Sequence, residues 1–404
     1  MPQWSGCSFR QIYLSLTALT PAAIRGTLTP LSNPSAAEAE WRALEPSAHG
    51  SFFTSWGWIG PWAAQAAAHT QLHLFRAQRH GETVGLAFVS MRGVTRRKGF
   101  VRVTQLQLNE HNAPDEDMII EHNGILAAES DLTECWQEFA RVALESKLPW
   151  GEVAFRSLTP MQSAAAQQAF RALRQDVDRA LPAWVVPLTP SHGDRESLHG
   201  AFKKKTRQQM RQALREYEAL GPLEIQIAAT ADDAERFFGE MEELHGARWA
   251  KVGQRGSFVN ADWQGFHRAV IALGLPRGEV VLARVTMGGA PIGFVYGLVW
   301  QGRLYAIQTG FKPQERAALR SGYVSHFLLM QHLASRDITI YDFLPDHESS
   351  YKRHLAEPEQ LLTTVRFQRP RLIFRMERLA VLVRDRLTAR RHTPAVEPLE
   401  DPQS

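Results

Sequence analysis

The chain has 404 residues, enough for two domains with a core each, and its 44% hydrophobic and 22% charged residues are typical of folded globular proteins. Its 46 basic and 42 acidic residues leave a net charge of +4, too small to indicate nucleic-acid binding. Two cysteines without a CxxC pair, no HExxH motif and no long apolar run argue against a disulfide framework, a metal site and a membrane span, and favour the cytoplasm.

The N-terminal region predicts a leader followed by a folded lobe. Residues 1–35 are rich in Ser, Thr, Pro and Ala, and we expect them to form a flexible leader. A secretory signal would need a basic start and a longer apolar core. A globular pattern begins at residue 36 and includes an aromatic cluster, which consists of Phe52, Phe53, Trp56, Trp58 and Trp62. Core packing explains this cluster, and an acyl-chain groove is the alternative.

Residues 72–93 read as two strands joined by a tight turn at His80-Gly81. A similar segment occurs at residues 280–302, and the matching residues are separated by a constant 208 positions. The matches are Leu74 with Leu282, Arg76 with Arg284, Gly81 with Gly289 and Gly85 with Gly293. A shared offset of about half the chain is typical of a duplicated domain, so we predict two tandem α/β lobes.

The first lobe is expected to span residues 36–190. It continues with strands at 100–108 and 152–156 and helices at 132–144 and 161–173. Because no glycine-closed anion loop separates these strands and helices, we expect this lobe to shape a site and not to bind a cofactor.

The second lobe, expected at residues 191–370, opens with a strongly basic helix at 203–215 that ends at Gly221-Pro222. Such a helix is either a solvated linker or a contact for an anion, which could be cofactor phosphates, an anionic carrier or the inner face of a membrane.

The next helix, at residues 232–250, carries His245, Arg248 and Trp249 near one face. A lone histidine on a helix is usually structural, but the arginine and tryptophan beside it raise the weight of a site role.

A strand, a loop and a helix then follow one another. Residues 304–311 alternate as a half-buried strand does, a polar loop at 314–322 ends in Arg320-Ser321-Gly322, and a helix is predicted at 323–335. A helix start offers unpaired N–H groups and the positive end of the macrodipole, so such a loop can hold a phosphate. Residues 338–344 predict one more strand.

The ordered set of these motifs resembles the CelD/BcsL-type acyltransferases of the GNAT superfamily, which are related to the FemAB-type tandem transferases. The resemblance covers mainly the C-terminal half. It rests on the motifs His245-Gly246-Ala247-Arg248-Trp249, Gly310-Phe311, Arg320-Ser321-Gly322, Asp342-Phe343-Leu344 and Tyr351-Lys352. Where the family usually has a glycine after the Asp-Phe-Leu strand, this chain has Pro345-Asp346-His347-Glu348.

This resemblance implies two tandem GNAT-like lobes, each a mixed, largely antiparallel sheet flanked by helices, and transfer of an acyl group from acyl-CoA to an amine without a metal. The donor would contact Thr309, Gly310, Phe311, Arg320, Ser321, Gly322 and Tyr323. His245 would serve as base or acceptor ligand, Asp342 would orient the amine, and Tyr351 or Tyr323 would protonate the thiolate. The acceptor would meet Arg248, Trp249, Glu348 and Lys352.

Relatives of this type are associated with exopolysaccharide production, and some acylate lipid amines, so amino sugars, sphingoid-type bases and amino acids all remain possible acceptors. A FemAB-type enzyme using aminoacyl-tRNA and a non-catalytic scaffold are the alternatives. We do not expect other nucleic-acid contacts, and the oligomeric state is open.

The C-terminal region, residues 371–404, predicts a basic amphipathic helix at 371–391 with Leu372, Met376, Leu379 and Val383 on one face, and a disordered tail from residue 392. We expect the apolar face to pack on the preceding lobe, and peripheral contact with the inner membrane is the alternative.

Overall fold

A computed structural model describes residues 23–96, 100–111, 120–251, 253, 256–313, 316, 318–347 and 351–391. Thirteen strands of this described part form one sheet, in the order β1-β2-β3-β4-β6-β13-β7-β12-β11-β10-β9-β8, with β5 paired to β3. The strands are β1 (Arg25–Leu31), β2 (Leu72–Arg79), β3 (Glu82–Arg96), β4 (Val101–Leu108), β5 (Leu126–Ala127), β6 (Glu152–Leu158), β7 (Arg174–Pro187), β8 (Leu223–Ile227), β9 (Val280–Met287), β10 (Ala290–Trp300), β11 (Arg303–Phe311), β12 (Ile340–Pro345) and β13 (Glu357–Gln368). The α-helices are α1 (Glu38–Leu44), α2 (Trp56–Ala66), α3 (Glu129–Glu145), α4 (Pro160–Ala169), α5 (Arg195–Gly200), α6 (Lys204–Glu218), α7 (Ala231–Lys251), α8 (Ala261–Gly274), α9 (Ser321–Leu333), α10 (Lys352–Leu355) and α11 (Leu372–Arg391).

The sheet consists of two halves with the same plan. In the first, β1 to β4 pair antiparallel and β4 then pairs parallel with β6. In the second, β8 to β11 pair antiparallel and β11 then pairs parallel with β12. The expected fold of two tandem, largely antiparallel α/β lobes is therefore confirmed.

Two side-chain contacts repeat at the positions that the sequence matched. Arg76 pairs with Glu40 of α1 at 2.6 Å, and Arg284 pairs with Glu240 of α7 at 2.9 Å. Gly85 and Gly293 each face a crossing helix, because an added Cβ would lie 2.7 Å from Cys135 Sγ of α3 and 2.1 Å from Ser325 Oγ of α9. Since both the ion pair and the close helix approach recur, the internal repeat has a structural counterpart.

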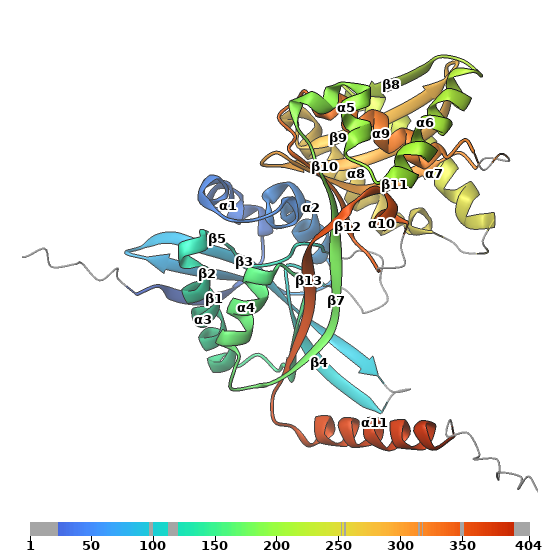
Figure 1. Ribbon diagram of the computed structural model, residues 1–404. Coiled ribbons are helices and arrows are strands. Elements are labelled where there is room, and N and C mark those ends of the chain that lie inside the picture. The colour runs from blue at the N-terminus through green and yellow to red at the C-terminus, as the bar shows by residue number, and fades with distance from the viewer. Residues whose placement is uncertain are drawn as a thin grey trace, which may run out of the picture.

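The last strands of the two halves join the lobes. Strand β13 of the second half lies between β6 and β7 of the first half, and β7 in turn pairs with β12 of the second. Figure 1 shows β7 and β13 running side by side from one lobe to the other. The sheet therefore continues across residue 190, where we placed the lobe boundary, and the boundary itself stays a prediction.

Aromatic residues of both lobes pack in one hydrophobic core. The N-terminal aromatic cluster belongs to this core, as the sequence analysis expected. Trp58 of α2 meets Phe266 of α8 with ring centroids 4.7 Å apart, and Phe53 meets Tyr305 of β11 at 5.4 Å. All five residues of the cluster are at most 4% exposed. Helices α3 and α4 cover a second core in the first lobe, and α5, α6 and α9 cover a third in the second lobe.

Part of the expected leader is ordered structure. Residues 25–31 form β1, which pairs antiparallel with β2, so the expectation of a flexible leader is wrong for this segment. Strand β1 is attached through long-range contacts that local composition does not reveal, including the Gly26 N–H, which donates to Glu138 Oε2 at 2.7 Å. Cys7, the rest of residues 1–22 and the expected tail from residue 392 lie outside the described residues. No helix in the described ranges is long and apolar enough to cross a membrane.

Candidate functional site

The segment from β11 to α9 consists of a strand, a loop and a helix, in the order that the sequence predicted. Arg320 precedes α9 with a left-handed backbone (φ 42°), which turns the chain into the helix. The hydroxyl of Ser321 donates to the Lys312 carbonyl at 3.0 Å. Gly322 is required by a close approach, because an added Cβ would lie 3.0 Å from the ring of Phe311. The loop is therefore held by specific contacts on both sides of its arginine.

One backbone N–H group at the start of α9 already has a hydrogen-bond partner. The N–H of Tyr323 donates to the Arg320 carbonyl at 2.9 Å and so belongs to the first turn of α9. This N–H group is therefore not free to bind a phosphate, whereas the expected contact of Tyr323 with the donor stays a prediction. The N–H groups of Ser321 and Gly322 remain the helix-start donors to consider.

A pocket of about 410 Å³ opens at this loop. Seven residues that the sequence analysis singled out line it together, namely Arg248, Phe311, Arg320, Ser321, Gly322, Tyr323 and Tyr351. Lys312, Pro313 and Arg316 complete the lining, so four side chains are cationic and none of the lining residues named for this pocket is acidic. We call it the donor pocket, since its charge and its helix start suit a phosphate-bearing ligand.

The strand beside the pocket is open along one edge. Strands β11 and β12 pair only between residues 303–305 and 340–342, while β12 pairs with β7 along its other edge. Beyond residue 305, β11 therefore continues to Phe311 without a strand partner on the β12 side. Gly310 lies on this free stretch, and an added Cβ would lie 2.6 Å from the Met241 carbonyl of α7. Thr309 donates its N–H to Gln308 Oε1 at 3.0 Å. Neither residue is among those that line the pocket, so their expected contact with the donor stays a prediction. Close packing on α7 explains why residue 310 is a glycine.

His245 is not among the residues that line this pocket. It is 5% exposed, its Nε2 accepts the indole N–H of Trp249 at 2.7 Å, and its ring packs on Phe258. Burial, together with the charge of Arg248, lowers the pKa of His245 to about 4. The three residues expected on one helix face therefore have different surroundings. Arg248 lines the pocket, whereas His245 and Trp249 do not and are hydrogen-bonded to each other. A neutral histidine whose lone pair is occupied is a weak base, and its catalytic role stays a prediction.

Asp342 lies in a buried charge cluster between the lobes. Its Oδ2 is 2.7 Å from Arg303 and 3.2 Å from His122 Nε2, and its Oδ1 accepts the N–H of Leu344. Although burial opposes it, the contacts with His122 and Arg303 hold the pKa of Asp342 below its ordinary value. Asp342 is not among the residues that line the donor pocket, and its expected role toward the amine stays a prediction.

Tyr351 lies at the donor pocket, and its neighbour Lys352 interacts electrostatically with a carboxylate of a second cavity. Tyr351 lines the donor pocket, and burial raises the pKa of its phenol. Lys352 Nζ donates to the Leu344 carbonyl at 3.3 Å and lies 3.5 Å from Asp346. Burial lowers the pKa of Lys352 in spite of its acidic neighbours. Glu348, the fourth expected acceptor contact, lies outside the described residues.

Sequence reasoning missed Glu121, which lines this second cavity of about 410 Å³ in the first lobe. Burial raises the pKa of Glu121 to about 8, against the charge of Lys352, and its Oε2 has no hydrogen-bond partner among the described residues. The cavity also contains Arg156, Arg179 and Arg366. We call it the acceptor cavity. The only local signal was the polar segment Glu121-His122-Asn123 directly after Ile119-Ile120.

Backbone strain concentrates around the same groups. His122, Ser157 and Leu344 have left-handed backbones with φ of 45°, 48° and 65°. His122 contacts Asp342, the Ser157 side chain contacts Glu121, and Leu344 accepts from Lys352. Non-glycine residues in this conformation cost free energy and often cluster at functional sites. Their grouping marks the junction of the lobes as a candidate site.

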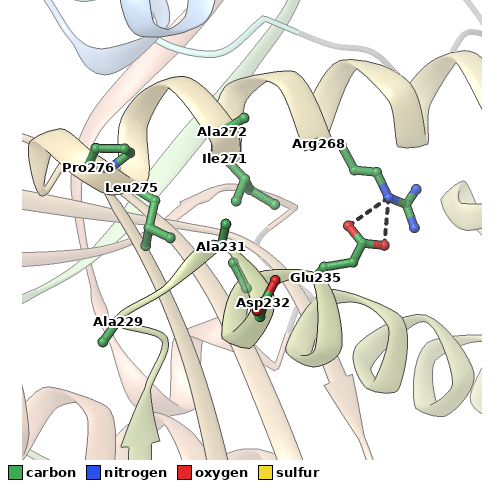
Figure 2. A pocket seen from close by; sticks show the side chains of 10 residues that line it. Ala229, Ala231, Asp232, Glu235, Arg268, Ile271, Ala272, Leu275 and Pro276 are labelled. Carbon is green, nitrogen blue, oxygen red and sulfur yellow. Dashed lines mark hydrogen bonds and ion pairs between the residues drawn. The ribbon is translucent and has the colours of Figure 1, made fainter.

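Another pocket of about 500 Å³ lies between the start of α7 and the end of α8 (Figure 2). Its walls are mainly alanine, leucine and isoleucine side chains, and Glu235 and Arg268 pair at its rim at 3.0 Å. Asp232 in this pocket is sixteen residues from Arg248 on the same helix, or about 24 Å. It is therefore separate from the donor pocket. Within the described ranges, no three His, Cys, Asp or Glu side chains are grouped as a metal site would need.

Comparison with known proteins agrees with this geometry. Residues 204–353 match the family model described as an acetyltransferase (GNAT) domain. No curated protein shows significant sequence similarity to the chain.

Among solved structures, FemX has a TM-score of 0.57 at 11% identity, over 84% of this chain and 98% of FemX. L-PGS from Bacillus licheniformis has a TM-score of 0.51 at 10% identity, over 82% of this chain and 92% of L-PGS. A conserved protein of unknown function from Bacteroides thetaiotaomicron has a TM-score of 0.50 at 13% identity, over 85% and 100%. Identities this low show a shared fold, and the CelD/BcsL type stays a prediction. Residues 204–353 are therefore similar to an acetyltransferase (GNAT) domain, and they lie within a sheet whose two halves share one plan.

Proposed function

We propose that this protein is an N-acyltransferase that moves an acyl group from acyl-CoA to an amine. The observation that carries the proposal is the donor pocket, where four cationic side chains surround the start of α9. Arg320, Arg316 and Arg248 pair with the phosphates of the donor there, and the N–H groups of Ser321 and Gly322 add hydrogen bonds. Phe311 and Tyr323 contact the pantetheine arm.

The reaction needs one proton removed and one supplied. The amine nitrogen attacks the thioester carbonyl carbon, the C–S bond breaks, and an amide and a coenzyme A thiolate result. Glu121 accepts the proton of the amine, because its Oε2 has no hydrogen-bond partner among the described residues and its pKa is near 8. Tyr351, which remains protonated, donates to the thiolate.

The acceptor enters from the first lobe. Arg156, Arg179 and Arg366 line the acceptor cavity beside Glu121, so an amine that also carries a phosphate or carboxylate fits this site. An amino sugar phosphate, an amino acid and a lipid amine with an anionic headgroup all meet this description. A role in exopolysaccharide or envelope lipid synthesis belongs to this proposal.

Binding of coenzyme A tests the donor assignment. We expect thermal stabilisation by coenzyme A, acetyl-CoA and a long-chain acyl-CoA that increases with ligand concentration. Arg320→Ala should raise the Kd at least about tenfold, since a hydrogen bond to a charged group contributes about 1.5–3 kcal/mol. Arg336→Ala, an exposed arginine after α9, is the control and should leave the Kd unchanged.

Equal coenzyme A affinity in Arg320→Ala would refute the pocket assignment. Absence of binding by any thioester would favour the FemAB-type alternative, in which the basic exposed face of α6 would bind tRNA, or a non-catalytic scaffold. The tRNA reading predicts protein–RNA binding that weakens steeply with salt.

A further inference from the structure

Four large apolar side chains are exposed at one end of the molecule. On α11, Leu372 is 74% exposed, Met376 is 65% exposed and Leu379 is 62% exposed. Phe100, just before β4, is 82% exposed. Figure 1 shows α11 beneath the end of the β3–β4 hairpin, so the helix and Phe100 belong to the same end of the first lobe. A group of large apolar side chains exposed on a protein surface usually marks a site that binds another molecule.

The opposite face of α11 holds the helix in place. Phe374 is 1% exposed and packs against Val94 of β3 and Val103 of β4. Glu377 pairs with Arg96 of β3 at 3.2 Å. We expected the face with Leu372, Met376 and Leu379 to pack on the lobe, and this expectation is wrong because Phe374 provides the packing. The side chain of Val383, assigned to that face, lies outside the described residues.

The surroundings of the exposed face are positively charged. Residues 369–381, whose side chains the structure describes, contain four arginines and one acidic residue, a net charge of +3. Arg375 lies on the exposed side of α11, and Arg102 is exposed on β4. Two copies of this chain would bring like charges together if they met through this face, which disfavours a dimer.

An anionic lipid bilayer complements both properties. A helix that lies in the membrane interface places its apolar residues at the headgroup boundary and its basic residues against anionic lipids. We propose that α11 and the adjoining end of the β3–β4 hairpin dock this protein onto an anionic membrane surface, with Leu372, Met376, Leu379 and Phe100 entering the headgroup layer. The donor pocket, beside α9 at the other end of the molecule, stays in water (Figure 1).

Co-sedimentation with lipid vesicles tests this proposal on the full chain. The wild-type protein should sediment with vesicles of phosphatidylcholine and phosphatidylglycerol, less with phosphatidylcholine alone, and less as salt rises. The variant L372S/M376S/L379S should bind at least about tenfold more weakly. A matched control, V177S/L220S/V259S, changes three residues exposed by 57%, 52% and 64% elsewhere, and it should bind as the wild type does.

Unchanged melting temperature, measured for both triple variants, shows that each one folds. Equal vesicle binding by L372S/M376S/L379S and the wild type would overturn the proposal. So would a wild-type dimer in solution that this variant abolishes, since a second copy would then cover the face. Both outcomes are independent of whether coenzyme A binds.

Discussion

His122 Nε2 of the first lobe lies 3.2 Å from Asp342 Oδ2 of the second lobe, and Arg303 holds the same oxygen from β11. The carboxylate is fully buried and contacts side chains from both halves of the chain. Next to His122, Glu121 faces the acceptor cavity. The contact thus places Glu121, the proposed base, close to the point where the two lobes meet.

Asp342→Asn should destabilise the protein by about 3 kcal/mol, because it removes the buried carboxylate opposite Arg303 and leaves only the more exposed Glu359 as an acidic partner. Urea unfolding measures this cost. Glu359→Gln removes the half-buried partner of Arg303 and should cost less than about 1 kcal/mol. If Asp342→Asn retains its stability but loses turnover, the carboxylate acts on the amine as the sequence resemblance implied.

Glu121→Gln should lower kcat by about 10²–10⁴, the usual contribution of general base catalysis, without changing the Kd of coenzyme A. Because burial raises the pKa of Glu121 to about 8, the wild-type rate should increase with pH through that value as the carboxylate deprotonates. Asp178→Asn in the same cavity should retain this profile. An unaltered pH profile in Glu121→Gln would exclude Glu121 as the base.

Gly310→Ala should destabilise the protein by about 1–3 kcal/mol, since the new methyl group would meet the Met241 carbonyl at 2.6 Å and push α7 from β11. Gly246→Ala on the same helix has no atom within 4 Å of the added carbon, and it should be neutral or stabilising by up to about 1 kcal/mol. Comparing the thermal unfolding of the two variants distinguishes a steric clash at Gly310 from a change in helix propensity at Gly246. Equal melting temperatures would contradict the packing.

Buried neutral histidines should make stability depend on pH. Burial lowers the pKa of His267 to about 3, so the folded state stays unprotonated at a pH where the unfolded chain takes up a proton. The contribution of neutral His267 to the free energy of unfolding is fully present above about pH 6.5. It decreases as the pH falls toward 3. Between about pH 7.5 and 5 the loss is about 2 kcal/mol.

Urea unfolding at both pH values checks this expectation. His267→Gln should show a smaller decrease in stability than the wild type, whatever its stability at neutral pH. His69→Gln changes an exposed histidine and should retain the wild-type decrease. If His267→Gln and the wild type lose the same stability, His267 is not the titrating group.

Local patterns were sufficient for most of the fold. Alternation and turn residues located both hairpins, the 208-residue repeat indicated the duplication, and the Arg320-Ser321-Gly322 loop identified the start of α9. Local patterns did not predict strands β1 and β7, because both strands form by pairing with segments that are distant in the sequence. Composition made residues 25–31 resemble a leader because strand pairing with β2 is not encoded in their own hydropathy.

The sequence likewise predicted one part of the candidate site and missed another. Side chains of the donor pocket come largely from one contiguous segment, so sequence order could group them. The proposed base could not be found in this way, because Glu121 approaches Lys352 only after β7 and β13 cross between the lobes. Only in the folded chain does the Trp249 N–H occupy the lone pair of His245, and only there do Arg303 and His122 contact the buried carboxylate of Asp342. The Oε2 atom of Glu121 is left without a hydrogen-bond partner among the described residues, which makes Glu121 the proposed base.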